Sequence, residues 1–361
     1  MLDPRAGDRA TPLAAVSKLD TLANSPRPRS WREITGPYAR PDAGRAIGQI
    51  LNTGLPFLAI MAAMLYGLDH GIWAAMLLAV PAAGLLVRLF IIQHDCGHGS
   101  FFKSRRANDL LGRVLGVLTL APYDFWRRAH AIHHATSGHL DRRGVGDITT
   151  LTVREYMARP TRGRLAYRLY RHPLVLFGLG PIYQFLIKHR IPSGNPIRYR
   201  RGWISVLGTN AMIVAIGALL ALTIGPGPFL LAYLPTIGLA ASIGVWLFYV
   251  QHQFENTYWE AAPRWDFHAA ALEGCSFYDL PRMLHWITGY IGYHHIHHLS
   301  CKIPNYHLRA CFAANPELQD ARRLSLRDSL RCARLALWDE DRRKLVSFRH
   351  ARQAVYAGAA G

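Results

Sequence analysis

The chain has 361 residues, of which 42 are Lys or Arg and 23 are Asp or Glu, so its formal net charge is +19 at pH 7. Half of the residues are hydrophobic and only 18% are charged, whereas about a quarter is typical of soluble domains. This balance argues against an ordinary soluble domain. No aromatic–basic binding module accompanies the positive charge, so we expect no nucleic-acid partner; a membrane surface or an acidic protein partner fits it better.

The N-terminal segment, residues 1–45, is polar and contains 8 Lys or Arg together with several prolines. It shows no secretory signal, because it lacks an apolar stretch behind its basic residues. We predict that it lies in the cytoplasm, ahead of a main domain that covers residues 46–315.

Four long apolar stretches follow in two pairs, and each is long enough to cross the hydrocarbon core of a bilayer as a helix. Arg88 is the only Asp, Glu, Lys or Arg within them. A buried hairpin of a soluble protein can contain one such helix, but four in two pairs favour membrane spans. The predicted spans are residues 47–68, 71–93, 204–224 and 229–251, and each pair forms a hairpin.

The basic residues indicate the orientation. The segment 94–203 contains 19 Lys or Arg and the segment 252–361 contains 14, whereas the two hairpin turns contain none. Cytoplasmic loops are enriched in Lys and Arg. We therefore expect both termini and the long middle segment on the cytoplasmic side.

Two shorter apolar stretches, 108–122 and 173–187, are flanked by basic residues. They are too short or too interrupted to span, so we expect helices that lie in the membrane interface. Residues 316–361 form the predicted C-terminal tail, of which 316–350 has the charge pattern of a surface helix. The expected fold is thus an all-α integral membrane protein with four spans, interfacial helices and a cytoplasmic cap.

Histidines gather where the predicted spans leave the membrane. His94 and His98 follow the second span in HDCGH, and His252 ends the fourth. A helix places residues i, i+3 and i+4 on one face, and two further boxes have this spacing. These are His130, His133 and His134 in HAIHH, and His294, His297 and His298 in HHIHH.

Nine neutral imidazoles exceed the four ligands of one zinc, and calcium and magnesium prefer oxygen ligands. Imidazole suits iron, copper, nickel and zinc. Divided over two metals, nine nitrogens give four or five each and leave a position for water or dioxygen. Two irons at a membrane face fit oxidation of an unactivated C–H bond in a lipid acyl chain.

The three boxes, in this order on two hairpins, resemble those of the membrane-bound fatty acid desaturases. The stretches HDCGHGSFF, HHATSGHLDRRG, QHQFENTYWE and HHIHHLSCKIPNY resemble the acyl-lipid Δ12/ω6 branch of bacteria and plastids. The resemblance covers about residues 45–315.

The resemblance implies a non-haem di-iron centre, with O2 as co-substrate, that inserts a cis double bond into a fatty acyl chain in a bacterial inner membrane. The implied iron ligands are His94, His98, His130, His133, His134, His252, His294, His297 and His298. The chain contains no His-Pro-Gly-Gly haem signature, so electrons are expected from a separate carrier, such as a small acidic ferredoxin. Four acidic residues near the boxes are candidates to orient the ligands: Asp95, Asp147, Glu255 and Asp279.

One position departs from the acyl-CoA desaturases, in which an Asn one turn before the solitary His reaches iron through a water. Here that position is Phe248, with Gln251 as a possible substitute, which favours a lipid-linked substrate. Three alternatives stay open on sequence: a di-iron hydroxylase of an apolar lipid or hydrocarbon, a metal transporter, and a lipid-binding module with structural zinc.

Overall fold

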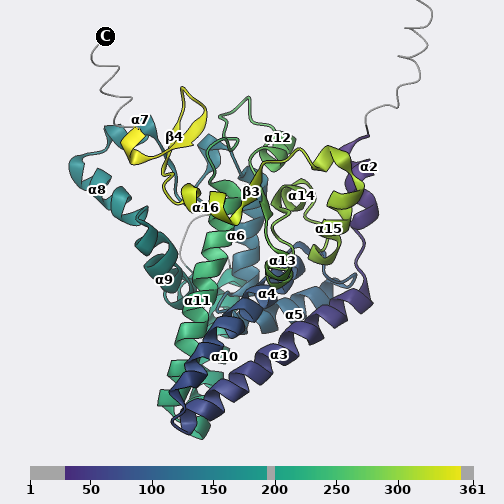
Figure 1. Cartoon of the computed structure of the whole chain (residues 1–361), viewed down its shortest axis with the longest axis vertical. Helices are drawn as coiled ribbons and strands as arrows, with labels where there is room; N and C mark the ends of the chain where they lie inside the picture. The colour runs from purple at the N-terminus through teal and green to yellow at the C-terminus, as the bar shows by residue number, and fades with distance from the viewer. Residues whose placement is uncertain (1–28, 193–199, 351–361) are drawn as a thin grey trace, which may run out of the picture.

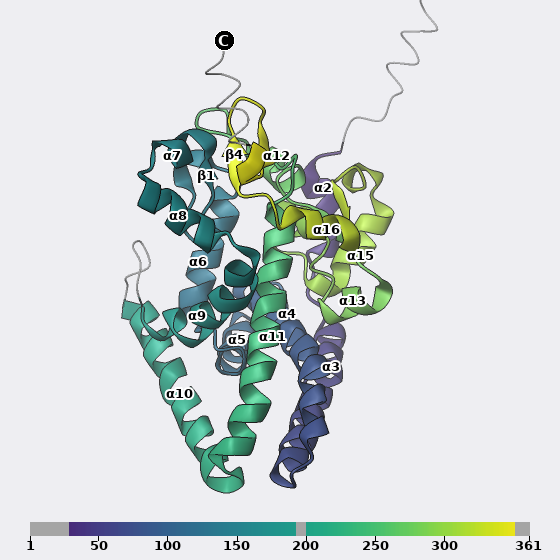
Figure 2. The ribbon, with the colours of Figure 1, turned by 60° about the vertical axis from the view of Figure 1, so that its left-hand side comes forward.

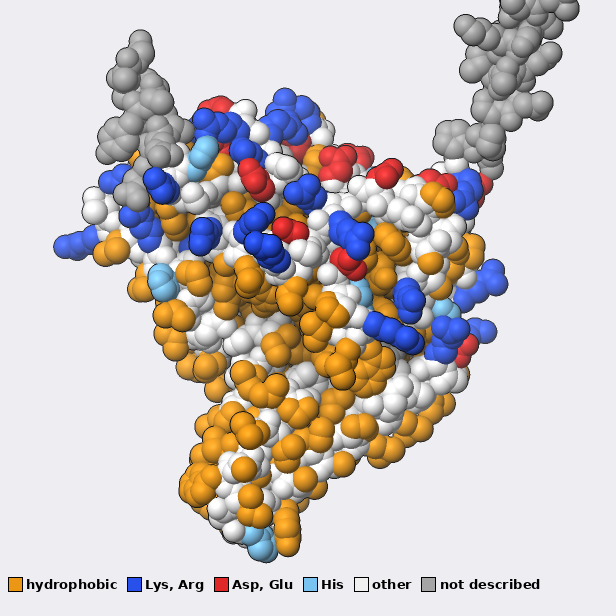
Figure 3. Space-filling model, in the orientation of Figure 1, with side chains coloured by type: hydrophobic (Ala, Val, Ile, Leu, Met, Phe, Trp, Pro, Cys, Tyr) orange, Lys and Arg blue, Asp and Glu red, His pale blue; other side chains and the backbone are white. Residues whose placement is uncertain are grey.

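The structure is a computed structural model that describes residues 29–192 and 200–350. Four long helices run side by side below a cap of shorter elements (Figure 1). Side chains on the long helices are mostly apolar, whereas Lys, Arg, Asp and Glu gather over the cap (Figure 3). The prediction of a mostly helical protein with four spans is confirmed.

The four helices long and apolar enough to cross a membrane are α3 (Ala43–Asp69), α4 with the 3-10 turn before it (Trp73–His98), α10 (Arg200–Ile224) and α11 (Pro226–His252). Three of them include the whole predicted span, whereas Trp73–His98 begins after the predicted start at residue 71 and continues past the predicted end at residue 93. The extra residues matter most at the ends of α4 and α11, which continue into the cap and carry His94, His98 and His252.

α4 is the most enclosed of the four helices, because α3, α5 and α11 all pack against it. α10 packs against α11 only near their shared turn, and the two helices diverge toward the cap (Figure 2). Most α10 side chains stay exposed, among them Leu207, Val214 and Leu222. Large exposed apolar faces on a spanning helix are what lipid contact requires.

Short helices and strands build the cap and its border with the spans. The short helices are α2 (Trp31–Thr35), α5 (Arg105–Leu118), α6 (Tyr123–Thr136), α7 (Val153–Ala158), α8 (Thr161–Tyr170), α9 (Gly180–Leu186), α12 (Phe267–Leu272), α13 (Arg282–Ile287), α14 (His294–Leu299), α15 (Asn305–Ala314) and α16 (Leu326–Cys332). The strands are β1 (Leu151–Thr152), β2 (Phe277–Asp279), β3 (Arg323–Ser325), β4 (Leu337–Asp339) and β5 (Lys344–Val346).

The two stretches predicted to lie in the interface are helical. The first, 108–122, corresponds largely to α5. The second, 173–187, contains a π-helical turn at Val175–Leu179 followed by α9. Both expose large apolar side chains, including Leu110 and Leu179.

The prediction of a surface helix over 316–350 is wrong for most of that segment. Only α16 and residues 348–350 are α-helical there; β3 pairs in parallel with β2, and β4 and β5 form an antiparallel hairpin whose other neighbour is β1. Trp338 and Leu345 of this hairpin are buried against Trp259. The tail therefore folds back over the loop that follows α11, and this pairing partner is remote in sequence.

A close approach fixes α5 against α6. The ring of Tyr123, which is buried, packs over Gly112 so tightly that a Cβ on Gly112 would lie 2.2 Å from Tyr123 Cε2. The phenol Oη donates to Cys96 O at 2.7 Å, which joins both helices to the cap end of α4.

We predict that Gly112→Ala destabilises the protein by roughly 1–3 kcal/mol, because the added methyl group overpacks the Tyr123 ring. Gly48→Ala is the matched control: it also lies in a helix, and a Cβ there meets no atom within 4 Å. Thermal unfolding of both variants in detergent measures the difference. Equal melting temperatures for the two variants would contradict the predicted clash.

Candidate metal centre

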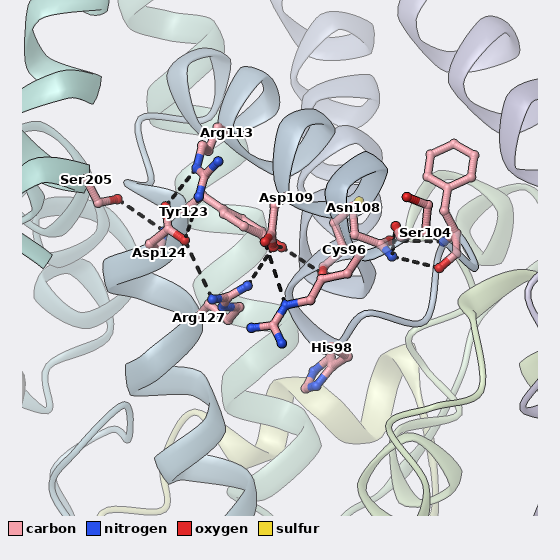
Figure 4. Close-up of polar contacts among 12 residues, drawn as sticks. Cys96, His98, Ser104, Asn108, Asp109, Arg113, Tyr123, Asp124, Arg127 and Ser205 are labelled. Atoms are coloured by element: carbon pink, nitrogen blue, oxygen red, sulfur yellow. Dashed lines mark hydrogen bonds and ion pairs between the residues drawn. The ribbon is translucent and has the colours of Figure 1, made fainter. Parts of the chain in front are cut away.

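The first histidine box lies at the end of α4. His94 and His98 share one face of this helix, and their ring centroids are 4.7 Å apart. The helix ends at Gly99, whose φ of 65° is in the left-handed region that glycine adopts without strain. His98 therefore occupies the last helical position, on the cap side of the spans (Figure 4).

The second box lies on α6, which packs against α4. One helical face presents His130, His133 and His134. Trp126, one turn earlier, stacks on the His130 ring with centroids 4.7 Å apart and also contacts His94, at 5.9 Å. This indole thus covers the side of the cluster that faces the first box.

The third box is α14 itself, and all of its histidines are buried. His252 is the last residue of α11, and its Nε2 lies 2.9 Å from His294 Nε2 and 3.2 Å from His133 Nε2. His252, which belongs to no box, therefore contacts one histidine of each HxxHH box.

The nine predicted ligand residues come together at one place and fall into two groups. Within each group, one nitrogen from every ring lies within 4.8 Å of all the others. The first group is His94, His98, His130, His134 and His297; the second is His133, His252 and His298. His294 joins the second group through its contact with His252, which gives a division of five and four.

The arrangement of the ring nitrogens suits binding of a cation better than hydrogen bonding between the rings. Four Nε2–Nε2 contacts between rings measure 2.9 to 3.2 Å, yet a neutral imidazole has only one N–H to donate. His98 Nε2 and His298 Nε2 are buried with no hydrogen-bond partner among the described residues. Converging lone pairs of this kind can be satisfied by a metal.

Burial keeps the imidazoles in the form that binds metals. Burial lowers the pKa of five histidines of the cap well below the ordinary value, and the neighbouring imidazoles lower the pKa of these five further. The histidines concerned are His130, His134, His294, His297 and His298. Neutral imidazole is the ligand form that iron, copper, nickel and zinc share.

Two carboxylates orient the ligand rings, one for each group. Asp95 Oδ1 lies 3.1 Å from His94 Nδ1, and Asp147 Oδ1 accepts a short hydrogen bond from His133 Nδ1. A donor role for Nδ1 leaves the Nε2 lone pair directed at the cluster. The other two acidic candidates lie elsewhere: Glu255 pairs with Lys344, and Asp279 with Arg323.

The segment 302–306 also supports the end of α4. The spacing of the boxes does not predict this support. The backbone N–H of Asn305, the first residue of α15, donates to Asp95 Oδ2 at 2.6 Å. Lys302 Nζ donates to His98 O at 2.6 Å. Both bonds join the end of α4 to the chain that leaves the third box.

Phe248 and Gln251 have roles that sequence alone does not distinguish. The Phe248 ring lies 5.0 Å from the His133 ring and 5.2 Å from the His252 ring, centroid to centroid, and so packs beside the second group. Gln251 instead donates from Nε2 to Ile291 O at 3.1 Å. Gln251 thus braces the turn before the third box and does not replace the Asn of the acyl-CoA enzymes.

Histidines outside the boxes lie away from the cluster or have other partners. His295 is fully buried, but its Nε2 points to Leu318 O at 3.0 Å, and burial lowers its pKa to about 4. His139 stacks on Trp265, and His189 contacts Gln184. His295 thus lies on a different face of α14 from His294, His297 and His298.

A pocket opens beside the second group, and its lining includes His133, His252 and Phe248. Asp147 and Arg143 lie on the same wall, and Tyr258 and Trp259 complete the side formed by the loop after α11. The pocket thus lies between the second group of histidines and the loop after α11, and its lining mixes polar and apolar side chains.

Comparison with known proteins identifies the family. The family model described as "Fatty acid desaturase" matches residues 71–329, which includes all nine histidines. The chain belongs to the fatty acid desaturase family. It is therefore a desaturase, an oxidoreductase of a membrane-bound type, whose buried histidine clusters are able to bind metal.

Individual relatives support this assignment. A "Fatty acid desaturase" of Bacillus subtilis is 48% identical over 312 residues, which are 86% of this chain and 88% of that protein. An "sn-1 oleoyl-lipid 12-desaturase" of Synechocystis is 29% identical over 62% of this chain and 63% of its own length. The Arabidopsis "sn-2 acyl-lipid omega-3 desaturase (ferredoxin), chloroplastic" is 30% identical over 64% of this chain and 52% of its own.

We predict that Asn305→Pro weakens metal retention about 10- to 100-fold, the range for loss of a group that orients a ligand. Proline removes the N–H that donates to Asp95, yet it suits the first position of a helix, and Pro304 before it is already extended at ψ 150°. Metal content after dialysis against a chelator measures the effect.

Asn305→Ala is the matched control. It keeps the backbone N–H, and the amide that it removes has no hydrogen-bond partner among the described residues. The orienting role of this N–H is wrong if both variants retain the same amount of metal.

Proposed function

We propose that this desaturase uses O2 and two electrons to insert a cis double bond into a fatty acyl chain of a membrane lipid, at a non-haem di-iron centre. The observation that carries the proposal is the convergence of nine buried imidazoles, divided five and four, at the cap ends of two apolar hairpins. The overall reaction removes two hydrogens from neighbouring methylenes, and with two electrons and two protons it converts O2 to two waters.

The two groups of histidines would each hold one iron. His94, His98, His130, His134 and His297 form one set of candidate ligands; His133, His252, His294 and His298 form the other. Bound iron would supply the reduction of O2 and the oxidation of the C–H bonds. The set contains no carboxylate or thiolate, and imidazole ligands of this number suit iron better than a single zinc.

The protein's own residues would orient the ligands and exclude water. Asp95 and Asp147 hold two rings by their Nδ1 atoms. Trp126 and Phe248 pack on ligand rings from opposite groups, so that water reaches them less easily. An acyl chain would approach from the bilayer, because the histidines lie where α4 and α11 leave it.

The proposed electron donor is a separate ferredoxin-like carrier. Two kinds of observation support it: the net charge of +19 favours an acidic partner, and relatives from Arabidopsis and Nostoc have names that specify ferredoxin. The Bacillus and Synechocystis relatives are bacterial proteins, so the proposed location is a bacterial plasma membrane. The basic residues favour a cytoplasmic cap.

We predict that expression in a host without polyunsaturated acids yields new fatty acids two mass units lighter than their precursors. Gas chromatography and mass spectrometry of the methyl esters measures this loss of two hydrogens. A variant with His252→Ala, expressed side by side, is the control. A product sixteen mass units heavier, from insertion of one oxygen, would show that the enzyme is a hydroxylase and would contradict the proposed desaturation.

We predict about two irons per chain in purified protein, from the division of the imidazoles into two groups. His294→Ala should lose iron, because His294 lies against His252 in the smaller group. His295→Ala is the matched neighbour: its ring faces Leu318, so iron should stay while the melting temperature falls. Elemental analysis per membrane-inserted chain distinguishes them, and a single zinc with no iron after anaerobic reconstitution would refute the di-iron proposal.

The orientation leads to a prediction of its own. Cysteine placed at His70 or Pro226, in the hairpin turns, should react with an impermeant thiol reagent added outside intact cells. Cysteine at the exposed Ala131, beside the second box, should react only after the cells are opened. Labelling of residues 70 and 131 from the same side would exclude the proposed topology.

A further inference from the structure

The outer face of α5 combines exposed apolar and basic side chains. Leu110 and Val114 are 67% and 54% exposed. Arg106 and Arg113 are also exposed. The four residues share one helical face, because Leu110, Arg113 and Val114 follow Arg106 at i+4, i+7 and i+8. A helix of 14 residues is about 21 Å long and cannot span a bilayer, so this face must meet another surface.

The place of α5 in the fold indicates which surface that is. α5 packs against α4, α6 and α10 and lies across the molecule at the border between the spans and the cap (Figure 1, Figure 2). Its neighbour α10 exposes Ile204 and Leu207 near the same border. Leu110 and Val114 thus lie near α10, whose exposed apolar side chains are suited to contact with lipid.

The acidic side chains of this region are turned inward and are already paired. Asp109 accepts from Arg127 at 2.6 Å, and Asp124 from Arg113 at 2.9 Å (Figure 4). Five basic side chains, Lys103, Arg105, Arg106, Arg113 and Arg127, outnumber these two carboxylates by three. Lys103 and Arg106 have no ion pair with any residue in 29–192 or 200–350. The outer face therefore has a positive charge.

We propose that the outer face of α5 binds anionic phospholipid headgroups of the leaflet nearest the cap. Leu110 and Val114 lie among the first acyl carbons, and Arg106 and Arg113 contact the phosphates above them. An acidic protein would complement the charge but would leave the two apolar side chains without a partner. The proposal uses the membrane insertion of the four helices and is independent of the chemistry at the histidines.

Bonds within the protein join this face to the candidate metal centre. Arg113 bonds Asp124 at the start of α6, and Arg127 on the next turn bonds Asp109 of α5. Tyr123 lies between them and donates to Cys96 O, two residues before His98. The helices that carry the first two boxes are thus joined directly behind the lipid-binding face.

The first test measures depth in the bilayer. The full chain carries a spin label at Leu110→Cys, in a Cys301→Ser background because the other native cysteines are buried, and is reconstituted in equimolar phosphatidylglycerol and phosphatidylcholine. The label should collide with O2 more often than with a water-soluble nickel chelate. The reverse is expected for a label at Arg159→Cys, because Arg159 is exposed and directly follows α7, a helix at the top of the cap (Figure 1). Equal, water-like accessibility at both positions would overturn the proposal.

The second test measures the headgroup. Short-chain phosphatidylglycerol is titrated into the detergent-solubilised chain and followed by native mass spectrometry. The apparent Kd should weaken roughly fivefold for each arginine removed in Arg106→Gln/Arg113→Gln. Arg159→Gln/Arg322→Gln removes two exposed charges from the cap and should leave the Kd unchanged.

Two results would overturn the headgroup assignment. One is the same loss of affinity in both double variants, which would show a diffuse charge effect. The other is full displacement of phosphatidylglycerol by inorganic phosphate at equal concentration, which would show a site for free anions. Neither result depends on iron or on product formation, so failure here is distinct from failure of the proposed desaturation.

Discussion

The structure depends on the burial of nine imidazoles that have mostly one another as neighbours. A buried polar group without a partner costs free energy, and unpaired nitrogens at His98 and His298 add to that cost. The surrounding structure must therefore hold rings from four helices at short distances without help from within the cluster. Metal binding would relieve this cost, and in that case part of the binding free energy of the metal is folding free energy.

Rigid helices meet that requirement. α4 and α11 leave the bilayer without a break and place His94, His98 and His252 at fixed heights above it. A hydrocarbon core favours intrahelical bonds for the backbone N–H and C=O groups of such segments, which keeps them helical up to the cap. α5 connects α4 to α6, and the segment with α12, β2 and α13 connects α11 to α14, so that the other boxes reach the same place.

Much of this arrangement could be predicted because it depends on local periodicity. The charge-free stretches locate the four spans to within a few residues, and the i, i+3, i+4 spacing predicts which side of each helix carries the rings. His295 is separated from His294 by the same rule. That the nine histidines bind iron stays a prediction, since periodicity brings nitrogens together without specifying the element.

The remainder depends on contacts between segments remote in sequence. The strands β4 and β5 form in a segment whose charge pattern indicates a helix, because β1 and the buried Trp259 provide a partner almost 200 and 80 residues away. The bond from the Asn305 N–H to Asp95 has no side-chain signal at all, as any residue but proline could donate it. Likewise, four acidic residues near the boxes look equivalent in sequence, and only tertiary packing distinguishes Asp95 and Asp147 from the other two.

The two carboxylates, Asp95 and Asp147, are divided between the two groups of histidines. Asp95 bonds a ring of the five-histidine group and Asp147 a ring of the other. Each group thus has one negative charge one imidazole away from where a cation would lie, and none in direct reach. Outer carboxylates raise the basicity of the rings they bond and offset part of the charge of a bound cation across the imidazole. Because the two groups consist of imidazole alone, no carboxylate within them would compete with a small molecule for an open position on a bound metal.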